Sequence, residues 1–118
     1  MSVLHQQIGE WLGLPAPKTE QQMLEMVEHQ LPTSAINRLV TLGLTRPEVD
    51  ALVIPLRTLQ HRRSRREKLT VEESDRVLRV ARLLAKAEAV YESRERALEW
   101  LRRPNPRALL DAPRRVPH

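Results

Sequence analysis

The sequence of 118 residues predicts an all-α fold, and three observations carry this prediction. Only three glycines occur and no hairpin dipeptide such as Asn-Gly is present, so the usual signals for paired strands are missing. Apolar residues recur at the three- and four-residue spacing of helices. In addition, Thr19, Thr45 and Thr70 each stand three positions before a Glu or Gln, which is the pattern of a capping box at the start of a helix.

Three short helices are expected before residue 45. The segment 2–13 carries its apolar residues on one side, and the proline-containing stretch LPAPK ends it. A second helix follows Thr19 and extends to about residue 31. A third begins after Pro32 and ends at Gly43, because glycine is the residue most often found just past the end of a helix.

Two further short helices are expected between about residues 45 and 64. The first begins at Thr45 and holds Pro47 in its first turn, where proline is tolerated. Pro55 opens the second, which extends toward Arg63. Two short helices separated by a tight break at Ile54-Pro55 form the outline of a helix-turn-helix, in which the second helix enters the major groove of DNA.

The longest helix is expected to begin at Thr70 and to extend to about Glu92. Its apolar residues form two adjoining stripes, which indicates a helix that is covered on more than one side. The helix is therefore either central to the fold or part of a dimer interface. Since a domain this small can hardly cover both stripes alone, we expect a homodimer formed through this helix and the helices before it. The stripes consist of Val77, Ala81, Leu84 and Tyr91, and of Val80, Leu83, Ala87 and Val90.

A last short helix is expected after Ser93, with Ala97, Leu98 and Leu101 directed inward. Trp100 on this helix has two interpretations: it caps the core, or it anchors a partner protein together with the polar residues that follow it. The remaining residues, 102–118, contain four prolines and no glycine, so they are expected to form an extended arm.

Positive charge is concentrated just before the longest helix. Residues 57–68 carry six Arg and Lys side chains against Glu67 alone, a surplus equal to the net charge of +5 of the whole chain. Such clustering favours a polyanion as partner. Within the second helix of the motif, donors suited to base edges are carried by Arg57, Gln60, His61 and Arg63, whereas Thr58 and Arg62 are expected to hold phosphates. The candidate DNA-binding residues are Arg57, Thr58, Gln60, His61, Arg62, Arg63, Arg65 and Arg66.

Other interpretations of this basic segment have less support. A solvated linker remains open, because a run of charge alone does not require a ligand. An RNA-binding surface is disfavoured, since no aromatic side chain lies among the arginines to stack on bases. A helix lying on a membrane surface is disfavoured too, because the segment lacks a broad apolar face.

Residues for catalysis or metal binding do not occur in a recognisable arrangement. The chain has no cysteine, and its four histidines are scattered without a pair at helical spacing. The acidic run at 72–75 is expected to cap the long helix through the helix dipole, with no bound cation. We therefore expect no enzyme activity, no catalytic or metal-binding residue and no cofactor. The absence of a signal sequence and of an apolar span of membrane length predicts a cytoplasmic protein without membrane contact.

Three motifs follow one another in the second half of the chain. They are I-P-x-R-T-L at residues 54–59, L-x-x-x-E-S-D-R at residues 69–76, and A-L-x-W-L-x-x-P-N at residues 97–105. In this combination the chain resembles the Xre-type antitoxins of the MbcA/ParS family, the partners of RES-domain toxins, over about residues 32–106. Residues 1–31 match that family only in helical character.

The resemblance implies an antitoxin that forms a homodimer, neutralises a RES-domain toxin and represses its own operon by binding operator DNA. The toxin of such a pair consumes NAD⁺ or transfers its ADP-ribose, whereas the antitoxin performs no chemistry. The chain then divides into residues 1–66, with the helix-turn-helix, and residues 67–118, with the long helix and the toxin-binding region. The toxin-binding residues implied are Leu98, Trp100, Leu101, Arg102, Arg103, Pro104, Asn105, Arg114 and Arg115.

The end of the chain departs from the family pattern. In the family, the segment after Pro-Asn passes through a glycine-containing turn into a tail that approaches the toxin's active site, whereas Ala108-Leu109 stand at this turn here. We therefore expect the arm to block entry to the toxin without filling its site. Two alternatives of other classes remain: a free-standing helix-turn-helix transcription regulator without a toxin, and a structural helical adaptor.

Overall fold

The computed structural model describes residues 3–103, and these residues form seven α-helices and no strand. The predicted all-α fold is therefore confirmed, and each expected helix is present within a few residues of its expected ends. The helices are α1 (Val3–Leu12), α2 (Glu20–Glu28), α3 (Ser34–Thr41), α4 (Arg46–Leu52), α5 (Leu56–Ser64), α6 (Val71–Tyr91) and α7 (Arg94–Leu101).

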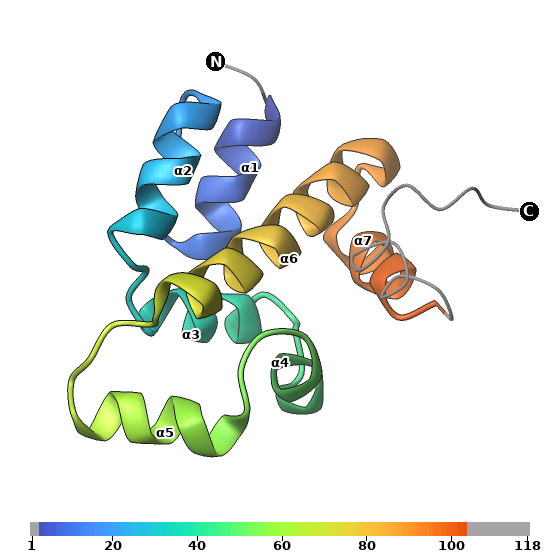
Figure 1. The fold of residues 1–118 in the computed structure, drawn as a ribbon. Helices are drawn as coiled ribbons and strands as arrows, with labels where there is room; N and C mark the ends of the chain where they lie inside the picture. The colour runs from blue at the N-terminus through green and yellow to red at the C-terminus, as the bar shows by residue number, and fades with distance from the viewer. Residues whose placement is uncertain (1–2, 104–118) are drawn as a thin grey trace, which may run out of the picture.

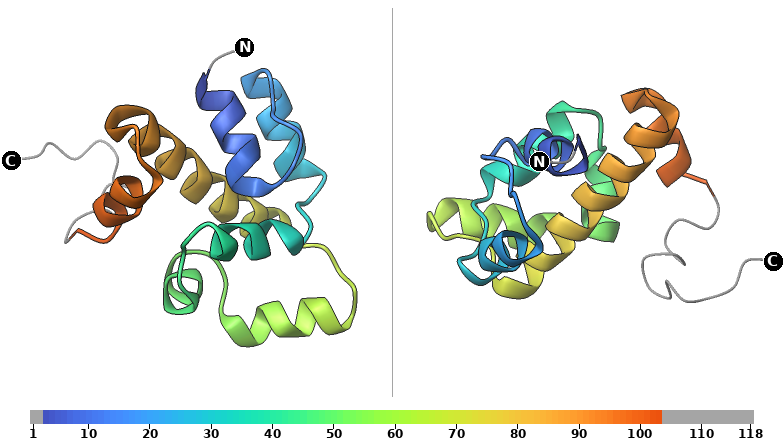
Figure 2. Two further views of the ribbon diagram at one scale, coloured as in Figure 1. Left: turned by 180° about the vertical axis from the view of Figure 1, so that it is seen from behind. Right: turned by 90° about the horizontal axis from the view of Figure 1, so that it is seen from above.

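The long helix α6 is the central element of the fold (Figure 1). Helices α1 and α2 pack against it on one side, and α7 packs beside its C-terminal half. Helix α3 lies between α6 and α5, and the view from behind shows the same order (Figure 2). The short helices α4 and α5 therefore lie at one end of the molecule, and α3 lies between α5 and α6.

A single chain covers most of both apolar stripes of α6. Five of the eight predicted stripe residues are buried, Leu83 and Tyr91 are half-buried, and only Val90 is largely exposed, at 75%. The covering helices α1, α2, α3 and α7 belong to the same chain. Contrary to expectation, a second copy is therefore not needed to cover the stripes, and homodimer formation stays a prediction without that support.

Backbone capping fixes where the helices begin. Thr45 and Thr70 each accept a hydrogen bond from the backbone amide three residues on, and the Glu at that position accepts one from the threonine amide in return. These two predicted capping boxes are confirmed. At Thr19 only half of the expected box is present, because the Gln22 side chain accepts a hydrogen bond from the amide of Lys18 instead.

Two long-range contacts join the N-terminal helices to α6. The buried indole of Trp11 donates a hydrogen bond from Nε1 to Glu88 Oε1 at 2.9 Å. The hydroxyl of Ser74, which is fully buried, accepts a hydrogen bond from the backbone amide of Leu31 at 2.8 Å. Helices α1 and α2 are therefore part of the hydrophobic core that α6 shares.

Gly43 lies where the chain turns from α3 toward α4, and its replacement by alanine is expected to lower the free energy of unfolding by about 2–4 kcal/mol. Its φ is +131°, a conformation that side-chain-bearing residues rarely adopt, and an added Cβ would lie 2.4 Å from Leu98 Cδ1 of α7. Denaturant unfolding measures the effect. Gly13→Ala is the control, because its φ is also positive, at +67°, but the added Cβ would meet the flexible Arg38 side chain at 3.2 Å. Equal losses for the two variants would contradict a cost set by Leu98.

Candidate nucleic-acid interface

The bend between α4 and α5 is held by three hydrogen bonds. The amides of Val53 and Ile54 both donate to the carbonyl oxygen of Val49, at 2.9 and 3.0 Å, which closes α4. The proline that precedes α5 offers no side-chain cap. Instead, the carboxylate of Asp50 on α4 accepts a hydrogen bond from the amide of Leu56 at 2.9 Å. One helix of the motif therefore caps the next, which fixes the angle between them.

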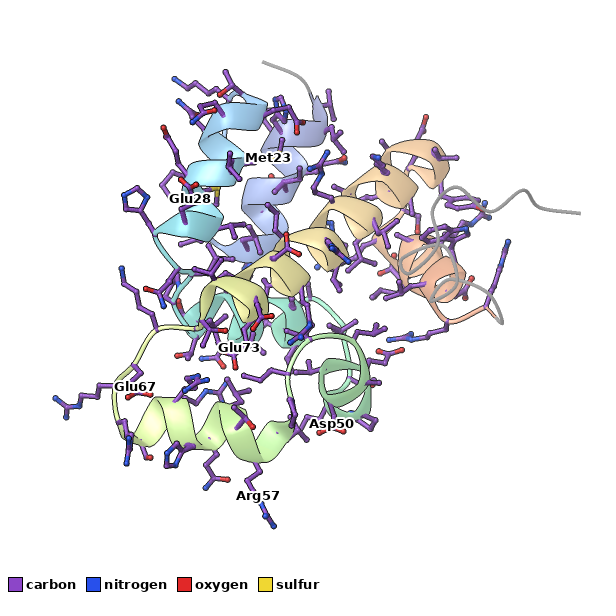
Figure 3. All side chains as sticks on the ribbon, viewed as in Figure 1. Met23, Glu28, Asp50, Arg57, Glu67 and Glu73 are labelled. Atoms are coloured by element: carbon purple, nitrogen blue, oxygen red, sulfur yellow. The ribbon has the colours of Figure 1, made fainter. Side chains whose placement is uncertain are left out.

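Helix α5 has a buried side and an exposed side. Leu59 is buried and Leu56 is half-buried on the inner side. The exposed side chains of the outer side recur at helical spacing, and Arg57 extends away from the body (Figure 3). Together with the half-buried Thr58, these residues line a shallow depression of about 460 Å³, and no acidic side chain is among them. We call this surface the α5 outer face; it consists of Arg57, Thr58, Gln60, His61 and Ser64.

The outer face carries the groups that DNA base edges recognise. A guanidinium matches the two acceptors of guanine, and a carboxamide matches the donor and acceptor of adenine. An imidazole or a hydroxyl pairs with either base. The face is one helix wide, which is the width that the major groove of B-DNA admits. Four of the eight candidate DNA-binding residues, Arg57, Thr58, Gln60 and His61, therefore lie together on it.

Arg65 and Arg66 continue the positive charge past the end of α5. Arg66 has a φ of 57°, the left-handed conformation usually taken by glycine after a helix. Its amide donates to the carbonyl of Arg63, and the amide of Glu67 donates to that of Arg62, which closes the helix end. Both arginine side chains are exposed, and the contact of Arg65 with Glu67 is long, at 3.9 Å. Their guanidinium groups are accessible to a phosphate.

Arg62 has a different position from the other arginines. Its guanidinium donates two hydrogen bonds to Glu73 at the start of α6, from Nε to Oε1 at 3.1 Å and from Nη2 to Oε2 at 3.0 Å. A further contact reaches Glu67 at 3.4 Å. Figure 3 shows Glu73 between α5 and α6, on the side away from the outer face. The prediction that Arg62 holds a phosphate is therefore replaced by a structural role, joining the end of α5 to α6.

Electrostatics favour the charged form of this pair. Burial raises the pKa of Glu73, but hydrogen bonds from Arg62 and from the Thr70 amide outweigh it, so the net pKa lies below the ordinary glutamate value. Hydrogen bonding to Glu73 raises the pKa of Arg62. The pair is therefore ionised at neutral pH, and it satisfies both carboxylate oxygens of a side chain that is only 10% exposed.

A groove of about 560 Å³ separates α5 from α3 and α4. Its floor is apolar, and its rim includes Asn37 of α3, Arg46 of α4, and Gln60 and Arg63 of α5. Arg63 donates a hydrogen bond to the side-chain oxygen of Asn37. Arg46 was missed by the sequence reasoning. An arginine in the first turn of a helix is electrostatically unfavourable, and this could have indicated a contact with an anion.

The residues expected to bind a toxin do not form one exposed surface. Leu98 and Leu101 are buried against α6, so they are core residues and their prediction as partner contacts was wrong. Trp100 is half-buried and Arg103 is exposed. Arg102 pairs with Glu48 of α4. The remaining residues of this prediction lie outside the described residues: Pro104, Asn105, Arg114 and Arg115.

Neither a cluster of metal-binding side chains nor a membrane-spanning helix occurs among residues 3–103. Between residues 3 and 103, no three His, Asp or Glu side chains gather in a way that could hold a metal ion. Within the same range, none of the helices is long and apolar enough to cross a membrane.

Comparison with known proteins identifies the family. Residues 22–82, from α2 into α6, match the family model of the antitoxin Xre-like helix-turn-helix domain, and this range includes α4 and α5. A curated relative, Antitoxin Xre of Pseudomonas putida strain KT2440, is 43% identical over 70 residues. The matched region is 59% of this chain and 44% of the relative, so the chain spans less than half of that protein. The chain belongs to the family of antitoxin Xre-like helix-turn-helix domains.

Proposed function

We propose that this protein is the DNA-binding antitoxin of a toxin–antitoxin pair, and that it represses its own operon. The observation that carries the proposal is the α5 outer face, which presents exposed base-recognising side chains on the second helix of a family-matched helix-turn-helix. In this proposal the protein is a regulator, and its chemistry is recognition alone.

DNA contacts divide between bases and phosphates in this proposal. Arg57, Gln60 and His61 read base edges from the outer face, because all three side chains are exposed on it. Arginine side chains and one threonine hydroxyl hold the sugar-phosphate backbone and set the orientation of α5. The phosphate-contacting set consists of Thr58, Arg63, Arg65 and Arg66, to which we add Arg46 on the rim of the groove.

The proposed toxin is a RES-domain protein that consumes NAD⁺ or transfers its ADP-ribose. This finer assignment is supported by the sequence resemblance to the MbcA/ParS family. The toxin docks on the outward side of α7 through Trp100 and Arg103, together with the residues that follow position 103. The division of the chain at residue 66 is then one of function, because α1 to α3 and α6 share a single core.

The proposed DNA binding is tested by selecting duplexes from a randomised library with the purified chain. Enrichment of one sequence family, with half-sites about one helical turn apart if the protein binds as a homodimer, is the expected result. Light scattering of the complex gives the number of chains per duplex. Failure to retain any duplex at low salt would favour a helical adaptor and overturn the DNA-binding assignment.

The proposed neutralisation of a toxin is tested by co-expression with the neighbouring gene product. Growth of cells that carry both genes, and arrest of cells that carry the neighbour alone, are expected. A neighbouring product without toxicity and without a RES domain would leave a free-standing transcription regulator as the better description.

Trp100→Ala is expected to weaken the complex with that neighbouring product by about 2 kcal/mol or more, because a large aromatic anchor dominates many interfaces. Affinity is measured by titration calorimetry with the purified partner. Trp100 also packs against the core, so the unfolding midpoint of the free variant is measured in parallel. Unchanged affinity would contradict the docking role and leave Trp100 as a cap on the core.

A further inference from the structure

The C-terminal end of α7 is joined to the helix-turn-helix by Arg102. Its guanidinium donates two hydrogen bonds to Glu48 of α4, from Nε to Oε2 at 2.6 Å and from Nη2 to Oε1 at 3.1 Å. Nη2 also donates to the backbone carbonyl of Gly43 at 2.9 Å. These partners are 54 and 59 residues away along the chain. The contact therefore brings the end of the described chain to the entrance of the motif.

Glu48 has a second function at the same place. Its Oε1 accepts a hydrogen bond from the amide of Thr45 at 2.9 Å and so completes the capping box that starts α4. Burial raises the pKa of Glu48, but the hydrogen bond from Arg102 and those from Thr45 outweigh it and lower the net pKa. One ionised carboxylate thus closes the first turn of α4 and anchors Arg102.

Apolar packing strengthens the junction. Leu98 of α7 lies so close to Gly43 that a Cβ at that glycine would be 2.4 Å from Leu98 Cδ1. The turn that leads into α4 therefore rests on the inner side of α7 and is held again by Arg102 at the carbonyl of Gly43.

The other end of the helix-turn-helix is held in the same way. Arg62 at the end of α5 pairs with Glu73, which is the capping-box glutamate of α6. Each end of the two-helix unit is thus joined to the body by an arginine with two hydrogen bonds to a capping-box glutamate. The Arg62–Glu73 pair lies inside the family-matched residues 22–82, whereas Arg102 and all of α7 lie beyond them.

We propose that Arg102 is a positioning residue for DNA reading, and that α7 is part of the DNA-binding unit. By holding Glu48 and the Gly43 carbonyl, it keeps α4 at the angle from which Asp50 caps α5 and presents the outer face. This inference rests on the proposed DNA binding and replaces the prediction that Arg102 contacts a toxin. By thermodynamic linkage, any ligand of α7 that draws Arg102 away from Glu48 must also weaken DNA binding.

The test compares Arg102→Ala with Arg103→Ala on a duplex selected by the wild-type chain. Both variants lose one positive charge at the end of α7, but Arg103 is exposed and makes no ion pair described among residues 3–103. Arg102→Ala is expected to lower DNA affinity about tenfold, since hydrogen bonds to a charged group are lost. Arg103→Ala is expected to change it less than about threefold, as the loss of an exposed charge without an ion pair should. Equal effects of the two variants would overturn the proposal.

Two further readouts separate positioning from other roles. A residue that holds a phosphate contributes about 0.9 to the slope of log affinity against log salt, so Arg102→Ala must leave that slope unchanged if it acts by positioning. Hydrogen exchange of the free protein should show faster exchange in α4 and unchanged exchange in the centre of α6. A reduced slope would assign Arg102 to direct phosphate contact, and faster exchange throughout would assign it to global stability; either result overturns the proposal.

Three further variants probe the contact between Arg102 and Glu48. Glu48→Gln keeps an acceptor for the Thr45 amide but loses the charge, and it should lower affinity as Arg102→Ala does. The loss for the double variant should be smaller than the sum of the two single losses, because both changes weaken the same contact. Arg102→Lys, which keeps the charge, should restore part of the affinity. If the wild type retains no duplex, the proposed DNA binding fails as well, whereas equal losses for Arg102→Ala and Arg103→Ala on a bound duplex reject only this inference.

Discussion

Simultaneous replacement of Arg57, Gln60 and His61 by alanine is expected to lower affinity for the selected duplex by at least about 100-fold, because each good base contact contributes about 1–3 kcal/mol. All three side chains are exposed on the α5 outer face, so the unfolding midpoint should stay unchanged. Fluorescence anisotropy at fixed salt measures the affinity. The expected loss applies to the selected sequence, and binding to unrelated duplexes should fall much less.

A matched control changes the same three residue types elsewhere. Gln21→Ala, His29→Ala and Arg94→Ala together remove one exposed glutamine, histidine and arginine from α2, its C-cap and α7. This variant carries the same net charge as the α5 variant and should bind the selected duplex nearly as well as the wild type. Similar losses for the two triple variants would mean that α5 does not read the bases.

Arg62→Ala is expected to lower the free energy of unfolding by about 2–3 kcal/mol, somewhat less than the loss typical of a fully buried pair because Arg62 is partly exposed. The change leaves the Glu73 carboxylate nearly buried and without its main partner. Arg65→Ala is the control, since its side chain is exposed and its ion pair is long, and it should cost less than about 0.5 kcal/mol. Denaturant unfolding followed by circular dichroism gives both values. A cost for Arg62→Ala no larger than that of the control would contradict the structural role.

The same pair predicts a pH dependence. The pKa of Glu73 is lower in the folded protein than its ordinary value, so its contribution to stability is fully present above the ordinary glutamate range and is lost as the pH falls through the folded value. Glu73→Gln should therefore be less stable than the wild type at pH 7, and this difference should shrink in acid. Unfolding curves between neutral pH and about pH 3 measure it. A difference that does not change with pH would show that ionisation of Glu73 contributes nothing.

Local signals in the sequence were sufficient for the helices and most of their starts. Thr45 and Thr70 lie three residues before a glutamate, and that spacing alone determines which backbone amides the side chains can reach. The bend at Ile54-Pro55 was also readable, because proline fixes the backbone and starts a helix. The contribution of Asp50, whose carboxylate caps α5, depends on the angle between α4 and α5 and could not be read from spacing.

The partners of the arginines could not be predicted in the same way. Arg62 and Arg63 are neighbours with the same side chain, but one turns toward Glu73 and the other toward Asn37. Their directions follow from how α5 lies against α3 and α6, which is a property of the packed chain. The Arg102–Glu48 pair joins residues 54 positions apart, and only the return of α7 to α4 brings them together.

The apolar stripes of α6 could be interpreted only in part from the sequence. Their width correctly indicated a helix covered on several sides, but spacing could not show which chain supplies the cover. The cover over one side comes from α1, whose Trp11 is tied to Glu88, and this helix lies before the family-matched residues. Leu98 and Leu101 show the same limit, because an apolar residue on a short helix serves a core or an interface with the same pattern.

Methylation interference on the selected duplex shows whether α5 reads bases in the major groove. Methylation of guanine N7 blocks the major-groove edge, and methylation of adenine N3 blocks the minor-groove edge. The wild-type chain should show interference at guanine N7 within each half-site, and Arg57→Ala should lose interference at one guanine. Interference confined to adenine N3, or an identical pattern for the wild type and Arg57→Ala, would mean that α5 does not read the major groove.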